Sequence, residues 1–222
     1  MKTIILNGSP KGNVEKCGSY LLAQAFAKKM STPCEIRSII KENRLDLIES
    51  IQHADNIILI APNYIHSVPA QTLDFLLALP PAKGNQTLGF IIQSGYPESS
   101  ESEIICRYLN RLGERLGYTV SGSIAKGECA GLAIVPERFK KLLDEFSAFG
   151  ALFEQTRQFD RQLVEKFAKP VRLSKPLMWL LNALTPLSDV LGWNRIMKSN
   201  QAYEKRLDTP YLGPAQVKTM NG

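Results

Sequence analysis

The sequence has few of the residues that cross-link a secreted protein or bind a structural metal. Only four of its 222 residues are cysteine and only two are histidine. The cysteines stand at positions 17, 34, 106 and 129 and include no C-x-x-C pair. This spacing favours reduced thiols over a disulfide framework or a zinc site. We therefore expect no disulfide and no structural metal.

Targeting segments and long apolar runs are also lacking. The first apolar run, Thr3–Leu6, is too short for a signal peptide, and no small-residue cleavage site follows it. Leu177–Trp193 is rich in Leu and Trp, but Pro186 and Asp189 interrupt it. The run is also shorter than the roughly twenty residues that a spanning helix needs. These features predict a cytoplasmic protein.

Three common nucleotide and hydrolase signatures are absent. There is no G-K-S/T sequence for a P-loop, no G-x-G-x-x-G for a dinucleotide site, and no G-x-S-x-G elbow. Two histidines give a hydrolase little to work with. A P-loop nucleotidase, a dinucleotide-binding Rossmann protein and a triad hydrolase are therefore disfavoured.

Positive charge is concentrated in the last third of the chain. The net charge is +6; residues 1–150 hold 16 Lys/Arg against 15 Asp/Glu, and residues 151–222 hold 11 against 6. No block of five or more like charges occurs, and no aromatic-basic interleaving points to base stacking. We expect no nucleic-acid binding.

Short apolar runs alternate with helical patterns through the first 150 residues, as in a parallel sheet with crossover helices. The expected strands are Thr3–Leu6, Glu35–Ile39, Asn56–Ala61, Leu88–Gln93 and Thr119–Ala125. The expected helices are Ser19–Met30, Leu45–His53, Ala70–Leu79, Ser100–Leu116 and Pro136–Phe149, and a capping box at Ser100 and Glu103 is predicted to begin the fourth. Mixed composition places the second and fifth strands near the edges. This pattern predicts a three-layer, doubly wound α/β fold with the flavodoxin-like strand order 2-1-3-4-5.

The pattern changes after residue 150. Leu152, Phe153, Phe159, Leu163 and Phe167 repeat at the spacing of one further amphipathic helix, and prolines interrupt the rest. We therefore predict a domain at 1–150 and a helical C-terminal extension at 151–222.

The loop after the first strand has the composition of an anion site. Gly8-Ser9-Pro10-Lys11-Gly12-Asn13 leads through a polar stretch to Gly18-Ser19-Tyr20, where a helix is expected to begin. Backbone N–H groups converge at such a turn, and the helix dipole favours negative charge. A phosphate would fit this loop, although a plain turn with Gly and Pro as breakers has the same composition.

Two further loops at the same edge of the sheet carry an aromatic residue between helix-breaking residues. The loop after the third strand reads Pro62-Asn63-Tyr64-Ile65-His66-Ser67-Val68-Pro69, and the loop after the fourth reads Ser94-Gly95-Tyr96-Pro97-Glu98. Ligands of open parallel sheets bind beyond the carboxyl ends of the strands. Together the three loops predict a slot for a flat ring with a phosphate tail.

These three loops resemble the signature loops of the flavodoxin-like NAD(P)H-dependent FMN reductases, over roughly residues 1–150. The resemblance implies that the first loop binds the FMN phosphate, through Ser9, Lys11, Asn13, Ser19 and Tyr20. It implies that the other two line the isoalloxazine ring, through Pro62, Asn63, Tyr64, Ile65, Ser94, Gly95 and Tyr96. It also implies a homodimer.

The function expected from this resemblance is hydride transfer from NAD(P)H to FMN, followed by reduction of a flavin, quinone or other small acceptor. The flavin would carry the chemistry, so no catalytic side chain is required. Two alternatives stay open: an FMN electron carrier of the flavodoxin type, and a flavin-free binding or regulatory module on the same fold.

The extension has more apolar surface than a solvated tail can expose. Its apolar residues are Leu177, Trp179, Leu180, Leu181, Leu184, Leu187, Leu191 and Trp193. They could bury against the core, a second subunit, or a membrane surface contacted through Arg172, Lys175, Arg195 and Lys198. We favour the second subunit, because the resemblance implies a dimer.

Overall fold

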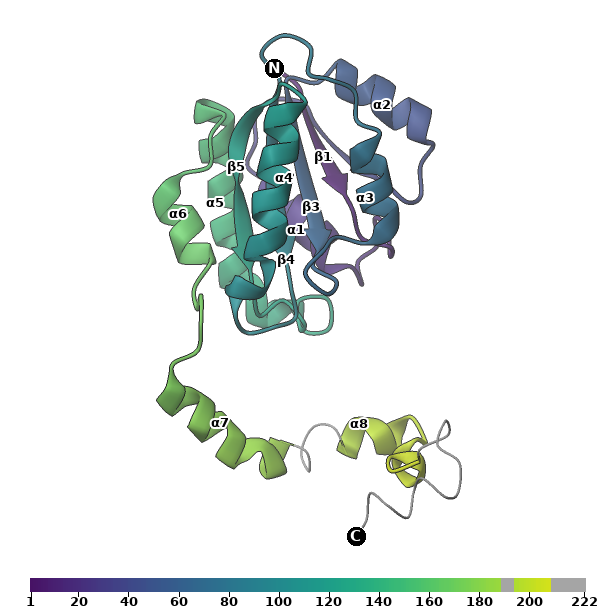
Figure 1. Cartoon of the computed structure of the whole chain (residues 1–222), viewed down its shortest axis with the longest axis vertical. Coiled ribbons are helices and arrows are strands. Elements are labelled where there is room, and N and C mark those ends of the chain that lie inside the picture. The colour runs from purple at the N-terminus through teal and green to yellow at the C-terminus, as the bar shows by residue number, and fades with distance from the viewer. Residues whose placement is uncertain (189–193, 209–222) are drawn as a thin grey trace. The chain divides into compact units, whose positions relative to one another are not determined.

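The computed structural model describes residues 1–188 and 194–208, which divide into two compact units, Met1–Arg172 and Leu173–Gly222. Of the apolar residues named for the extension, Leu191 and Trp193 lie outside the described residues. The first unit contains a five-stranded sheet (Figure 1). Its strands are β1 (Thr3–Asn7), β2 (Cys34–Ser38), β3 (Asn56–Pro62), β4 (Thr87–Gln93) and β5 (Thr119–Lys126).

All neighbouring strands are parallel, in the order β2-β1-β3-β4-β5. This is the predicted flavodoxin-like order, with the second and fifth strands at the edges. Helices connect the strands and cover both faces. They are α1 (Gly18–Ala27), α2 (Arg44–Gln52), α3 (Ala70–Leu77), α4 (Glu103–Arg115), α5 (Lys140–Thr156) and α6 (Arg161–Phe167), with 3-10 turns η1 (Ser99–Ser102) and η2 (Pro136–Phe139).

The continuous apolar run of β3 shows why the sheet is covered on both faces. Side chains alternate along a strand, so Ile57 and Leu59 face one side and Ile58 and Ile60 the other. The first pair packs in a cluster with residues of α2, α3 and α4, and the second pair with residues of α1, α5 and α6. An uninterrupted apolar strand is therefore stable only between two helical layers.

The first unit extends past residue 150, because phenylalanines of α5, α6 and their linker pack on α1 and the sheet. Phe149 stacks edge-on against Phe26 of α1 at 5.4 Å between centroids and against Phe159 at 4.9 Å. Phe167 lies 4.5 Å from Phe146. The predicted boundary at 150 therefore falls inside α5, and residues 151–172 belong with the sheet.

Two local predictions differ from the structure. The single helix expected from Leu152 to Phe167 is divided by Arg157, whose left-handed backbone (φ 56°) ends α5, and Asp160 caps α6 through the Leu163 N–H. The capping box at Ser100 and Glu103 does not form. Ser100 lies in η1, and α4 begins after Ser102, whose side chain makes no capping bond.

The second unit contains α7 (Lys175–Ser188), α8 (Asn194–Ser199) and the 3-10 turn η4 (Tyr203–Lys205). Tyr203 lies under two cations, at 4.9 Å from the Lys198 Nζ and 4.0 Å from the Arg206 guanidinium. The helical character predicted for this part of the chain is confirmed for the described residues.

We predict that Gly150→Ala will destabilise the first unit by about 3 kcal/mol or more. A Cβ at Gly150 would lie 1.8 Å from the carbonyl oxygen of Phe26, and a backbone group cannot rotate away. The matched control is Gly113→Ala in α4, where the new Cβ meets only side chains, those of Val120 at 3.0 Å, Leu88 at 3.5 Å and Phe90 at 3.8 Å. Urea unfolding should show a large loss for Gly150→Ala and a change below about 1 kcal/mol for the control; equal changes would contradict this account.

Candidate functional site

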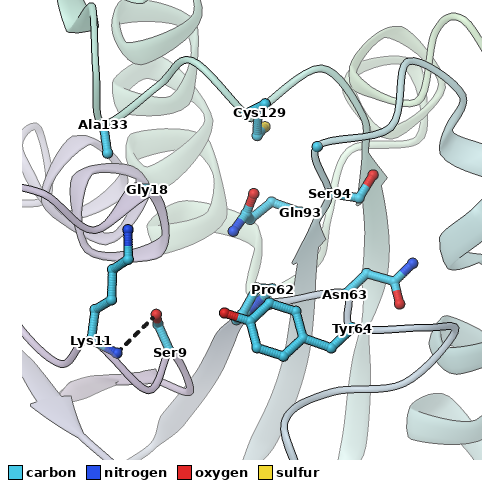
Figure 2. Close-up of a pocket in the computed structure, with 12 residues that line it drawn as sticks. Ser9, Lys11, Gly18, Pro62, Asn63, Tyr64, Gln93, Ser94, Cys129 and Ala133 are labelled. Atoms are coloured by element: carbon cyan, nitrogen blue, oxygen red, sulfur yellow. Dashed lines mark hydrogen bonds between the residues drawn. The ribbon is translucent and has the colours of Figure 1, made fainter. Parts of the chain in front are cut away.

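A pocket of about 180 Å³ lies at the carboxyl ends of the strands. The loops after β1, β3, β4 and β5 form its walls together with the first residue of α1 (Figure 2). Because every strand runs in the same direction, these loops meet at one edge of the sheet. The fold therefore brings together segments that are more than a hundred residues apart in sequence.

The side chain of Asn7, at the end of β1, holds the loop that follows. Its Nδ2 donates to the Gly12 carbonyl at 2.9 Å and to the Asn13 Oδ1 at 3.0 Å, and its Oδ1 accepts from the Ser9 N–H at 3.0 Å. Asn13 in turn donates to the Ile36 carbonyl of β2. The loop is thus fixed by buried amide groups.

The N-terminus of α1 opens onto the pocket at Gly18. Cys17 precedes the helix without a side-chain hydrogen bond to it, and the first helical bond is from the Leu21 N–H to the Cys17 carbonyl. Within the described residues, the N–H groups of Gly18, Ser19 and Tyr20 have no partner. Unpaired N–H groups at the positive end of a helix attract an anion.

Lys11 supplies the one charge among the described residues that line the pocket. Figure 2 shows its side chain extending beside Gly18, with the backbone bond from the Lys11 N–H to the Ser9 Oγ at its base. Its Nζ donates to the Lys16 carbonyl at 3.2 Å. The α1 side of the pocket is consequently electropositive.

An aromatic side chain borders the pocket at the loop after β3. Tyr64 is 50% exposed, and its backbone pairs with Ser67 across a tight turn in which Ile65 and His66 both have positive φ. An isoleucine rarely adopts this left-handed conformation. The turn therefore holds Tyr64 in place at the cost of local strain.

Two buried polar atoms of lining residues have no hydrogen-bond partner. They are the Oδ1 of Asn63 and the Oγ of Ser94, whose residues are 6% and 2% exposed. The N–H of Gly95, which is an exposed residue, also makes no bond within the described residues. Unpaired buried groups are costly, at roughly 1–3 kcal/mol each, and a ligand or water with matching polar groups relieves that cost.

The Cys129 thiol lines the pocket without being a nucleophile. Burial is the main cause that raises its pKa to about 12, with Glu128 adding to the effect and Lys126 opposing it. Its Sγ donates to the Gly127 carbonyl at 3.4 Å. The thiol is thus protonated at neutral pH.

The structure brings part of the predicted site together. The predicted residues that line the pocket are Ser9, Lys11, Pro62, Asn63, Tyr64, Ser94 and Gly95. The others, Asn13, Ser19, Tyr20, Ile65 and Tyr96, do not line it. Asn13 braces the loop, Ser19 is fully buried, and Ile65 and Tyr96 are exposed outside the pocket, at 86% and 53%.

Several lining residues were not in the predicted site: Gly18, Gln93, Cys129, Ala130 and Ala133. Gln93 could have been found, because it is a polar residue at the carboxyl end of the apolar run of β4. The alanines carry no chemical signal, and only the path of the loop after β5 places them at the pocket.

We predict that iodoacetamide at pH 8 leaves Cys129 unmodified in the folded protein and modifies it in urea. Mass spectrometry of the tryptic peptides measures this. Because the folded pKa lies above the ordinary value of 9.0, the free energy of unfolding should fall as the pH rises above about 9, and less so in Cys129→Ala. Alkylation of the folded protein at the rate of a free thiol would contradict the prediction.

No family of known sequences matches this chain, and no curated protein matches it. Solved structures match its fold. An NADPH-quinone reductase from P. pentosaceus is 17% identical with a TM-score of 0.54, and the match covers 68% of this chain and 98% of that one.

Two further solved structures are similar at the same level. An NADH:FMN oxidoreductase in its apo form is 14% identical with a TM-score of 0.52, over 77% of this chain and 97% of that one. An FMN-dependent NADH-azoreductase from Bacillus anthracis, in complex with FMN, is 12% identical with a TM-score of 0.50, over 69% of this chain and all of that one. These likenesses bear on the fold alone, and with the strand order they show that the chain has the flavodoxin-like fold.

Proposed function

We propose that the protein is an FMN-dependent oxidoreductase that oxidises NAD(P)H and reduces a small acceptor such as a flavin or quinone. The observation that carries the proposal is the polarity of the pocket. An uncapped helix N-terminus and Lys11 lie on one side of it, and Tyr64 and neutral groups lie on the other. This arrangement suits a flat ring that carries a single anionic tail.

The residues present fit FMN. The α1 N–H groups and Lys11 would hold its phosphate, since both attract an anion. The unpaired Asn63 Oδ1, Ser94 Oγ and Gly95 N–H offer acceptors and a donor for the polar edge of a ring. The pocket, at about 180 Å³, is smaller than the 300–1,000 Å³ typical of ligand sites, so part of the ligand would remain open to a second substrate.

When bound, FMN supplies the hydride and electron transfer chemistry. The residues of this chain bind and orient it. The Gly95 N–H can donate to an acceptor atom of the ring, and Tyr64 can stack against a flat face. The Tyr64 N–H is already bonded to the Ser67 carbonyl, at 2.6 Å, and contributes no donor. Cys129 is protonated and takes no part as a nucleophile.

Lys11→Gln should weaken FMN binding at least tenfold, because a bond to a charged group contributes about 1.5–3 kcal/mol. Riboflavin, which lacks the phosphate, should bind equally well to the variant and the parent. Lys29→Gln is the matched control, since Lys29 is exposed outside the pocket and the two variants have the same net charge. Quenching of flavin fluorescence measures each affinity; an equal loss for FMN and riboflavin would place the phosphate elsewhere.

Ser94→Ala should weaken FMN and riboflavin alike, because Ser94 is assigned to the ring. The control is Ser121→Ala on β5, which removes an equally buried and unpaired hydroxyl outside the pocket. A loss for FMN alone, or an effect of the control, would contradict the assignment of Ser94.

Oxidation of NADH and NADPH, with FMN loaded and a quinone or free flavin as acceptor, tests the activity. If the parent oxidises the nicotinamide and Lys11→Gln lowers the rate at low FMN concentration, the result supports the oxidoreductase. FMN binding without nicotinamide oxidation would support an electron carrier instead, and absence of flavin binding would support a flavin-free module.

A further inference from the structure

The α7 helix presents an exposed apolar stripe. Leu177, Leu180, Leu181 and Leu184 recur at the i, i+3, i+4, i+7 spacing that places side chains on one face of a helix. Their side chains are 41–48% exposed. In the first unit, apolar residues at such spacing are buried against the sheet, so α7 is built to contact something outside its own unit.

The charged residues of α7 and α8 are all cations. Lys175 lies in the first turn of α7, and Arg195 and Lys198 belong to α8. Among the described residues, none of these three cations forms an ion pair. The described ion pairs of lysine or arginine with a carboxylate all lie in the first unit. The sequence from 173 to 222 holds six Lys/Arg against three Asp/Glu.

We propose that α7 and α8 bind the surface of an anionic membrane, with the leucine stripe inserted among the lipids and the cations at the head groups. Exposed apolar side chains, together with cations that form no ion pair among the described residues, match the two parts of such a surface, an apolar interior and a layer of negative charge. This role is independent of the proposed oxidoreductase activity.

The length of α7 favours lying on the membrane over crossing it. Fourteen residues at about 1.5 Å each span roughly 21 Å, less than the roughly 30 Å hydrocarbon core, and Pro186 interrupts the helix. Over residues 1–188 and 194–208, no helix is long and apolar enough to span a bilayer.

A second copy of the chain is the occupant favoured by sequence alone, but charge argues against it. A second copy would bring the same excess of positive charge to the interface, since residues 173–222 hold six Lys/Arg against three Asp/Glu. Like charges across an interface oppose association, whereas an anionic surface attracts the cations.

The test is flotation of the full-length protein with phosphatidylcholine vesicles, with and without phosphatidylglycerol. We expect flotation with the anionic vesicles only, and its loss at high salt. Failure to float with the anionic vesicles, or equal flotation with the neutral ones, would overturn the proposal.

Two variants separate the contributions of the stripe and the cations. Leu180→Ser with Leu184→Ser should reduce vesicle binding at least tenfold, as should the triple change Lys175→Gln, Arg195→Gln and Lys198→Gln. Asn182→Ala, away from the stripe, is the control and should bind as the parent does. FMN affinity should be the same in all of them, which verifies that the first unit is folded.

Sedimentation equilibrium tests the alternative. If the parent does not bind vesicles but forms a concentration-dependent dimer, and the double leucine variant does not, the stripe contacts a second copy of the chain. That result would replace the membrane proposal and leave the proposed activity untouched.

Discussion

The close packing of α5 on α1 is the contact on which the pocket depends. The two helices approach so closely that Gly150 has no room for a Cβ beside the Phe26 carbonyl, and phenylalanines fill the space around this contact. The same approach positions the start of α1 and the loop that leads to α5. Leu132 of that loop is buried in the same cluster as Leu22 of α1 and Phe149 of α5, close to the pocket wall at Cys129.

Opposite sides of the pocket differ in character because they come from different loops. The loop after β1 supplies a lysine and uncommitted backbone N–H groups, whereas the loops after β3 and β4 supply an aromatic ring and unpaired neutral polar atoms. The positive charge on one side would attract an anionic group, and the neutral side would accommodate an uncharged flat ring. The protonated thiol of Cys129 adds to this neutral lining, so the pocket is suited to holding a cofactor that brings its own chemistry.

The two units of the chain expose different surfaces. The first buries apolar side chains on both faces of the sheet, whereas α7 leaves four leucines exposed. A surface with this composition is stable in water only if it is small or has a partner. On the two proposals above, the first unit holds the cofactor and the second attaches the protein to a surface.

The sequence alone determined the strands, their order and the edge of the sheet that holds the site, because strand periodicity, crossover handedness and loop composition are local or general rules. It also identified the lysine and tyrosine of the pocket. Tertiary structure decided the rest. Asn13 has the chemistry of a phosphate ligand, yet it is hydrogen-bonded to Asn7 and to Ile36 of β2. Ser19 is fully buried, and its hydroxyl accepts a bond from Gln93. Ala130 and Ala133 reach the pocket only through the path of a loop. The first unit extends past the predicted boundary at 150 because Phe159 packs on Phe149 and Phe167 packs on Phe146. Helical periodicity does not encode such contacts between separate segments.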